Sequence, residues 1–229
     1  MSELVRMFIG HFAVGLAAKR LAPRASLPVL LAAPQVLDIA WPIFVATGVE
    51  HARIVKGVTA ASPLALDYMP YSHSLVAAAL WSIGFGIGYL LLTRDRRAAG
   101  VLAACVMSHW ILDWIAHAPD MPILSGDGPR YGLGLWNSIP ATLVVEGAMF
   151  AAGAWLYVRS TRATDRAGAI GYWALIAVLA VAYVGAIFGP PPPSINTMVG
   201  VALGGLVVLP WAWWIDRHRQ TRPELLAAA

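Results

Sequence analysis

The chain has 229 residues, of which 59% are hydrophobic and only 12% are charged. Soluble domains carry about 25% charged residues, so this composition excludes a soluble globular protein. The net charge of +4 comes from short basic groups without interleaved aromatic residues, which argues against nucleic-acid binding, and the single Cys105 excludes an intrachain disulfide.

Apolar stretches of about 20 residues without period-two alternation predict an all-α, polytopic membrane helix bundle. We predict one transmembrane domain over residues 1–229, with seven spans at residues 3–19, 27–47, 72–93, 98–118, 136–158, 168–188 and 197–215. Glu3 and Arg6 dilute the first span, so a six-span arrangement with a re-entrant first segment stays open. Pro34 and Pro42 are expected to kink or break the second span.

Basic residues occur in four short groups, within residues 19–24, 94–97, 159–166 and 217–222. Either arrangement of spans places all four groups on the same side of the membrane. Because short loops rich in Lys and Arg stay in the cytoplasm, we predict a cytoplasmic C-terminus and an N-terminus outside.

The most distinctive stretch runs from Ser108 to His117, where His109, Asp113 and His117 recur at four-residue spacing. Residues four apart lie on one stripe of a helix, and the two histidines are about 12 Å apart along its axis. This geometry allows one ion held by His109 and Asp113, or two ions with Asp113 between them. The alternative is a helix that pairs these polar residues with neighbouring helices.

Ionisable side chains in five of the predicted spans lie at a similar depth, in the outer half of the bilayer. An unpaired charge at mid-bilayer costs roughly 2.5–3.5 kcal/mol, and a shared cation would offset several such costs. We therefore predict one metal site whose ligands come from separate helices: His11, Asp38, His73, His109 and Asp113. The spans within 168–215 lack such residues and are predicted to be scaffold.

Other polar residues near this depth have less definite predictions. Glu146 is interpreted as a ligand, a general base, a proton-sharing partner or a helix-packing hydrogen bond. Glu50 and His51 are expected to form a surface pair, although their loop could fold over the site. Asp67 and Asp120 are expected to cap helix ends rather than to join the site.

Four short motifs within residues 10–120 resemble those of a known family. They are Gly10-His11, Pro34 followed by Asp38, Ser72-His73-Ser74-Leu75, and Ser108-His109 with Asp113. They resemble the YdjM-like family of bacterial inner-membrane, metal-dependent hydrolases, which is distantly similar to zinc-dependent phospholipase C. The family's Pro-Asp-x-Asp is here Pro-Gln-Val-Leu-Asp, so one carboxylate is absent and Asp38 is displaced. The resemblance implies a multi-pass protein of the bacterial inner membrane.

The leading hypothesis is a membrane-embedded hydrolase that uses one or two divalent ions, with zinc as the first choice and manganese or iron as alternatives. His117 or Glu146 would carry protons. The depth of the site predicts a membrane lipid or an amphipathic ester, phosphoester or amide as substrate. A metal-ion or proton transporter or channel, and a non-catalytic membrane protein with a structural metal, remain alternatives. No oligomeric state is predicted.

Overall fold

The computed structural model describes residues 9–124 and 128–227. This part of the chain contains six helices that are long and apolar enough to cross a membrane, so the protein is an all-helical, multi-pass membrane protein. They are α2 (Leu27–Ala46), α3 (Leu75–Thr93), α4 (Arg96–Ala116), α5 (Ile139–Ser160), α6 (Arg166–Phe188) and the segment Ile195–Arg217. That last segment comprises α7 (Ile195–Gly204), the 3-10 turn η2 (Gly205–Val207) and α8 (Val208–Arg217).

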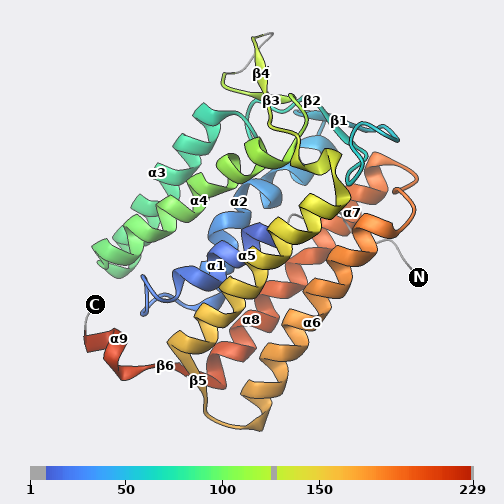
Figure 1. The fold of residues 1–229 in the computed structure, drawn as a ribbon. Coiled ribbons are helices and arrows are strands. Elements are labelled where there is room, and N and C mark those ends of the chain that lie inside the picture. The colour runs from blue at the N-terminus through green and yellow to red at the C-terminus, as the bar shows by residue number, and fades with distance from the viewer. Residues whose placement is uncertain (1–8, 125–127, 228–229) are drawn as a thin grey trace.

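The first predicted span, residues 3–19, corresponds in the structure to a ten-residue helix, α1 (Ile9–Ala18). Ten residues rise about 15 Å, roughly half of a bilayer core. Residues 1–8 lie outside the described part of the chain, so seven spanning helices and an outside N-terminus are not confirmed. α1 lies in the middle of the bundle and contacts α2, α4 and α5 (Figure 1).

Two glycines let α1 approach its neighbours closely. A Cβ added at Gly15 would lie 2.4 Å from the carbonyl oxygen of Leu30 in α2, and one added at Gly153 of α5 would lie 2.4 Å from that of Ala13. Small residues at helix interfaces allow such close packing inside membranes. These two contacts hold the short helix that carries His11.

The helix ends agree with the sequence in some places and differ in others. Ser74 caps α3 by accepting a hydrogen bond from the Ala77 amide, which is the usual role of a serine at the start of a helix. Of the two expectations for the prolines of the second span, a break is wrong, because α2 continues as one helix through Pro34 and Pro42, and a kink stays a prediction. α4 ends at Ala116, so His117 follows the helix in extended backbone instead of continuing its stripe.

Short strands cover one end of the bundle (Figure 1, top). β1 (His51–Ile54) pairs antiparallel with β2 (Leu64–Tyr68), and β3 (Met121–Pro122) pairs with β4 (Arg130–Tyr131), which the 3-10 turn η1 (Leu135–Asn137) follows. The Arg130 guanidinium donates hydrogen bonds to the carbonyls of Leu66, Asp67 and Asp120 at 2.8–3.2 Å. One side chain thereby joins the two strand pairs into a cover.

The opposite end gathers the basic residues. β5 (Thr161–Ala163) pairs there with β6 (Arg219–Thr221), which precedes α9 (Pro223–Ala227). A hollow at this end is lined by Lys19, Arg24, Arg162 and Arg219, which come from three of the four basic groups. The Asp216 carboxylate accepts a hydrogen bond from the Leu27 amide at 2.8 Å, so the last spanning segment caps the first residue of α2.

Candidate metal centre

The five predicted ligands converge in the structure, and we call them the ligand cluster. His11 comes from α1, Asp38 from α2, His73 from the segment just before α3, and His109 and Asp113 from α4. Four of these side chains are at most 5% exposed, whereas the Asp38 side chain is 27% exposed. The cluster is therefore closed on most sides and open at Asp38.

Four of the ligand atoms form a ring of the size that a metal ion requires. Asp113 Oδ2 lies 3.0 Å from His109 Nε2 and 3.6 Å from His73 Nε2. Asp38 Oδ1 lies 3.8 Å from His109 Nε2 and 3.7 Å from His73 Nε2. Ligands at 2.0–2.2 Å from a tetrahedral zinc ion are about 3.3–3.6 Å apart, so two imidazoles and two carboxylates fit one ion with small adjustments.

The hydrogen bonds of His109 fix which of its ring nitrogens faces the cluster as an acceptor. Its Nδ1 lies 2.7 Å from the carbonyl oxygen of Pro34, which can only accept, so Nδ1 carries the proton. The neutral ring then has a lone pair on Nε2. This buried nitrogen makes no hydrogen bond within the described chain, although Asp113 Oδ2 is 3.0 Å away. A metal ion between the two atoms, or a proton on the ring nitrogen, would offset the repulsion between the carboxylate and this lone pair.

A second chain of hydrogen bonds sets His73 in the same way. The Ser72 hydroxyl donates to Glu50 Oε2 at 2.6 Å and lies 2.7 Å from His73 Nδ1. Since that hydroxyl has only one proton, it accepts from Nδ1–H, and His73 Nε2 faces the cluster with a lone pair. Such outer partners orient the histidines of metal sites and raise their basicity.

Glu50 anchors this chain from the loop after α2. Its side chain is buried, and Oε1 accepts hydrogen bonds from the amides of Tyr71 and Ser72, both at 2.8 Å. The expectation of a surface pair is therefore wrong for Glu50, although its neighbour His51 is exposed. A loop glutamate gives no helical pattern, so the sequence offers little signal for this role beyond proximity to the predicted site.

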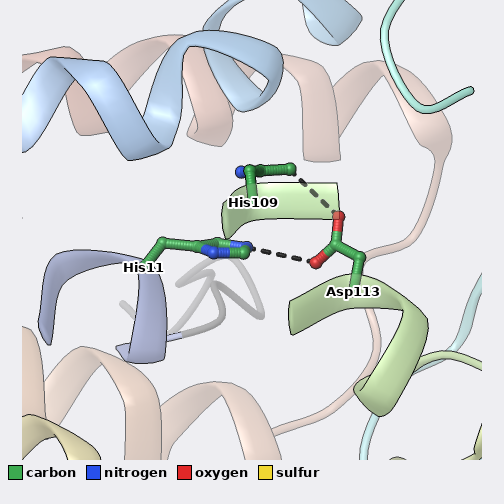
Figure 2. A group of neighbouring side chains, drawn as sticks. All are labelled: His11, His109 and Asp113. Carbon is green, nitrogen blue, oxygen red and sulfur yellow. Dashed lines mark hydrogen bonds and ion pairs between the residues drawn. The ribbon is translucent and has the colours of Figure 1, made fainter. Parts of the chain in front are cut away.

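His11 stands on the other side of Asp113. Its Nε2 lies 3.1 Å from Asp113 Oδ1, and its ring stacks on that of His109 at 3.9 Å between centroids (Figure 2). Asp113 can therefore direct one oxygen to His11 and the other to the four-atom ring. His11 acts as a further ligand or as the residue that orients Asp113.

His117 lines the same cavity as the cluster but points to a different partner. Its Nδ1 lies 3.2 Å from Asp120 Oδ1, and its ring packs 4.4 Å from that of Trp136. Asp120 is thus a partner of His117 and not a cap of a helix end. The position suits a proton carrier at the wall of the cavity better than a ligand.

Glu146 occupies another place. It is fully buried and accepts a hydrogen bond from the Trp136 indole at 2.9 Å. Together with Thr142 and Tyr183 it lines a separate small cavity. Trp136 stands between Glu146 and His117, so of the interpretations of Glu146 the geometry favours the packing hydrogen bond.

Asp67 also lies away from the cluster. It belongs to β2 and forms a two-bond ion pair with Arg53 of β1 at 2.6 and 2.8 Å, so it caps no helix. The Arg53 guanidinium holds the pKa of the Asp67 carboxyl below its ordinary value. This pair stabilises the strands that cover the site.

The cavity beside the cluster has a free volume of about 80 Å³, and its lining is apolar apart from the ligand cluster, His117 and Gln35. One wall comes from α2 and the opposite wall from α7, η2 and α8. The segment predicted as scaffold therefore contributes no ligand among the described residues, but it shapes the space in which a substrate would lie.

Comparison of the chain with protein-family models, with curated proteins and with solved structures finds no match in any of the three. The resemblance to the YdjM-like family stays a prediction. The structure shows buried His and Asp groups that could hold a metal ion in a multi-pass membrane protein.

Proposed function

We propose that the protein is a membrane-embedded, metal-dependent hydrolase whose ligand cluster binds one divalent ion. The observation that carries the proposal is the spacing of His109 Nε2 and Asp113 Oδ2, which lie 3.0 Å apart without the alignment of a hydrogen bond, as two ligands of one ion would. Since His109 presents a single lone pair, one ion shared by Asp38, His73, His109 and Asp113 accounts for the ring of distances. The motif resemblance supports the same class.

Zinc is the ion we propose, because mixed imidazole and carboxylate ligands suit it, and manganese or iron are the alternatives. A bound divalent ion would supply a Lewis acid and lower the pKa of a water molecule. The chain's own contributions are the fixed tautomers of His73 and His109, which keep two lone pairs aimed at one point. His117, oriented by Asp120, would move protons at the cavity wall.

The proposed substrate is a membrane lipid or another amphipathic ester, phosphoester or amide. The supporting observation is that the cavity is polar at the ligand cluster and mostly apolar along its two helical walls. A polar linkage would therefore reach the cluster from the open edge at Asp38, while an apolar part stays in the membrane interior.

We also propose that the protein lies in a bacterial inner membrane with its basic end in the cytoplasm. Three of the four basic groups line one hollow at that end, and the hairpin cover lies at the opposite end (Figure 1). This distribution follows the preference of Lys and Arg for cytoplasmic loops. The ligand cluster would then open toward the outer half of the bilayer.

The test is metal analysis and hydrolysis by purified protein. We expect about one zinc per chain in the wild type, and loss of both metal and hydrolysis of a lipid-ester panel in His109→Ala and Asp113→Asn. His51→Ala is the matched control, because His51 is an exposed histidine of β1. Full metal retention in both cluster variants would reject the metal centre, and bound metal without hydrolysis of any ester, phosphoester or amide would reject the reaction.

A further inference from the structure

The cavity beside the ligand cluster continues past it between two helical walls. On α2 its lining follows one stripe, with Leu31, Gln35, Asp38 and Ile39 at helical spacing. The facing wall follows a similar stripe across the break between α7 and α8, and its lining residues are Met198, Ala202, Gly205, Leu206 and Leu209. Residues 198–209 cover about 16 Å along a helix, so the lining extends well beyond the ligand cluster, and we call the space between these two walls the channel.

Gln35 is the one feature of this channel that packing does not explain. The residue is 6% exposed, and within the described chain neither its side-chain oxygen nor its nitrogen has a hydrogen-bond partner. Burying a carboxamide without partners costs folding free energy, so such groups in native proteins call for an explanation. An apolar residue of the same size would be more stable at this position.

The position of Gln35 indicates what its partner is. It precedes Asp38 by three residues on the same face of α2, and both line the channel where the cluster is open. A carboxamide offers two donors and an acceptor at adjacent atoms. This pattern complements a carbonyl or phosphoryl oxygen next to a hydroxyl, as in the linkage region of a single-chain glycerolipid.

We propose that Gln35 binds the polar linkage of a single-chain amphiphile, whose aliphatic chain lies in the channel between α2 and the α7–η2–α8 wall. The space between the two walls, about 80 Å³ in volume, has no room for two chains. The inference rests on the proposed function, because it places the linkage beside the metal centre, and it names the substrate class and the residue that selects it.

The experiment uses the full, metal-loaded chain in detergent and a lysophosphatidylcholine that carries a diazirine at the end of its acyl chain. After irradiation, peptide mapping should find the label on residues of the channel walls, with Leu206 and Leu209 as the expected sites. Gln35→Leu should reduce this labelling about tenfold, the loss expected for one or two hydrogen bonds, while metal content stays unchanged.

The melting temperature of the same variant is a second measurement. It should rise if Gln35 serves binding, whereas it would fall if Gln35 served the stability of the fold. Removing a buried amide without partners should raise the melting temperature of Gln35→Leu by about 2–4 °C. Gln220→Leu is the matched control, because Gln220 is an exposed glutamine of β6, and it should change neither labelling nor melting temperature.

The inference would be overturned by label spread over exposed apolar residues such as Val144 and Leu92, by labelling unchanged in Gln35→Leu, or by a lowered melting temperature in that variant. Hydrolysis of the probe without label on the channel walls would also overturn it while sparing the proposed function. Channel labelling that depends on Gln35, without hydrolysis of the probe, would support the binding site and count against the hydrolase.

Discussion

At the residue scale, the cluster depends on side chains that do not touch the ion. A chain of hydrogen bonds links Glu50, Ser72 and His73. The bond to Glu50 orients the Ser72 hydroxyl, which in turn sets which nitrogen of His73 can act as a ligand. The buried carboxylate therefore contributes by holding a tautomer. This role is comparable to that of the carboxylates behind zinc-bound histidines.

We predict that Glu50→Gln weakens metal binding about 10–100-fold. The amide nitrogen would face the Ser72 hydroxyl, which would then accept from it and donate to His73 Nδ1, placing the proton on Nε2 toward the ion. Competition with a fluorescent zinc chelator measures the affinity. Glu224→Gln, at an exposed position in α9, is the control, and equal affinities for the wild type and Glu50→Gln would contradict the prediction.

For His117 we predict unchanged metal binding and a loss of turnover. Because it faces Asp120 and lines the cavity without belonging to the four-atom ring, His117→Gln should keep its metal and lose turnover about 10²–10⁴-fold. Elemental analysis and initial rates on the same preparation test this. Loss of metal in His117→Gln would make the residue a ligand and not a proton carrier.

At the element scale, α1 matters most because it is central and carries His11. Its position depends on the close backbone approach at Gly15 and Gly153. A substitution on α5 that displaces α1 should therefore also displace His11 and weaken metal binding.

We predict that Gly153→Ala destabilises the protein by about 1–3 kcal/mol and weakens metal binding, since its Cβ would overlap the backbone of Ala13. Gly147→Ala on the same helix is the control, because nothing lies within 4 Å of its added Cβ, and it should be neutral or gain up to about 1 kcal/mol. Denaturant unfolding of both variants measures the difference. Equal stabilities would show that α1 is not held by this contact.

The β1–β2 cover should respond to acid. The pKa of Asp67 is lowered by its hydrogen bond with Arg53, so the pair stabilises the fold above the ordinary carboxyl pKa of about 3.9 and loses that effect as the pH falls through the lowered value. Asp67→Asn should therefore have a slightly lower melting temperature than the wild type at pH 7 and an equal one at about pH 2. A gap that persists unchanged at low pH would contradict the assignment.

At the scale of the whole molecule, the ligand cluster ties α1, α2, α4 and the segment before α3 to one point. A ligand that binds only the folded state stabilises it, by about 2.7 kcal/mol when its concentration is a hundred times its dissociation constant. The metal should therefore stabilise the packing of the elements in the first half of the chain.

Chelation should accordingly lower the melting temperature of the wild type by about 5–10 °C. His109→Ala, which lacks the central ligand, should melt at the same temperature with or without the chelator. Scanning fluorimetry with excess ethylenediaminetetraacetate, followed by zinc addition to restore the wild type, measures both. A chelator effect of equal size in His109→Ala would place the responsible metal elsewhere.

Much of this arrangement could be predicted from the sequence, because the membrane makes ionisable residues expensive. His11, Asp38, His73, His109 and Asp113 stand out among apolar neighbours at a common depth, and the structure brings all five together. Membrane-spanning helices are visible for the same reason. A stretch of about 20 apolar residues is typical of a membrane-spanning helix, and the described chain contains six such helices.

What the sequence could not predict depends on tertiary packing. Glu50 lies in a loop, where burial follows from how the strands fold over the bundle and not from periodicity. Gln35 is neutral, so it raised no expectation until its unpartnered amide was located. The passage of α2 through Pro34 depends on packing against neighbouring helices, which overrides local propensity.

The hydrogen bond from the Leu27 amide to Asp216 has a consequence for biosynthesis. The first full-length helix to enter the membrane begins with a backbone donor whose partner belongs to the last one. During insertion, water or lipid head groups must therefore hydrogen-bond to the Leu27 amide until α8 has inserted and brings Asp216 to it. The last spanning segment thus completes the N-terminal cap of the first full-length helix.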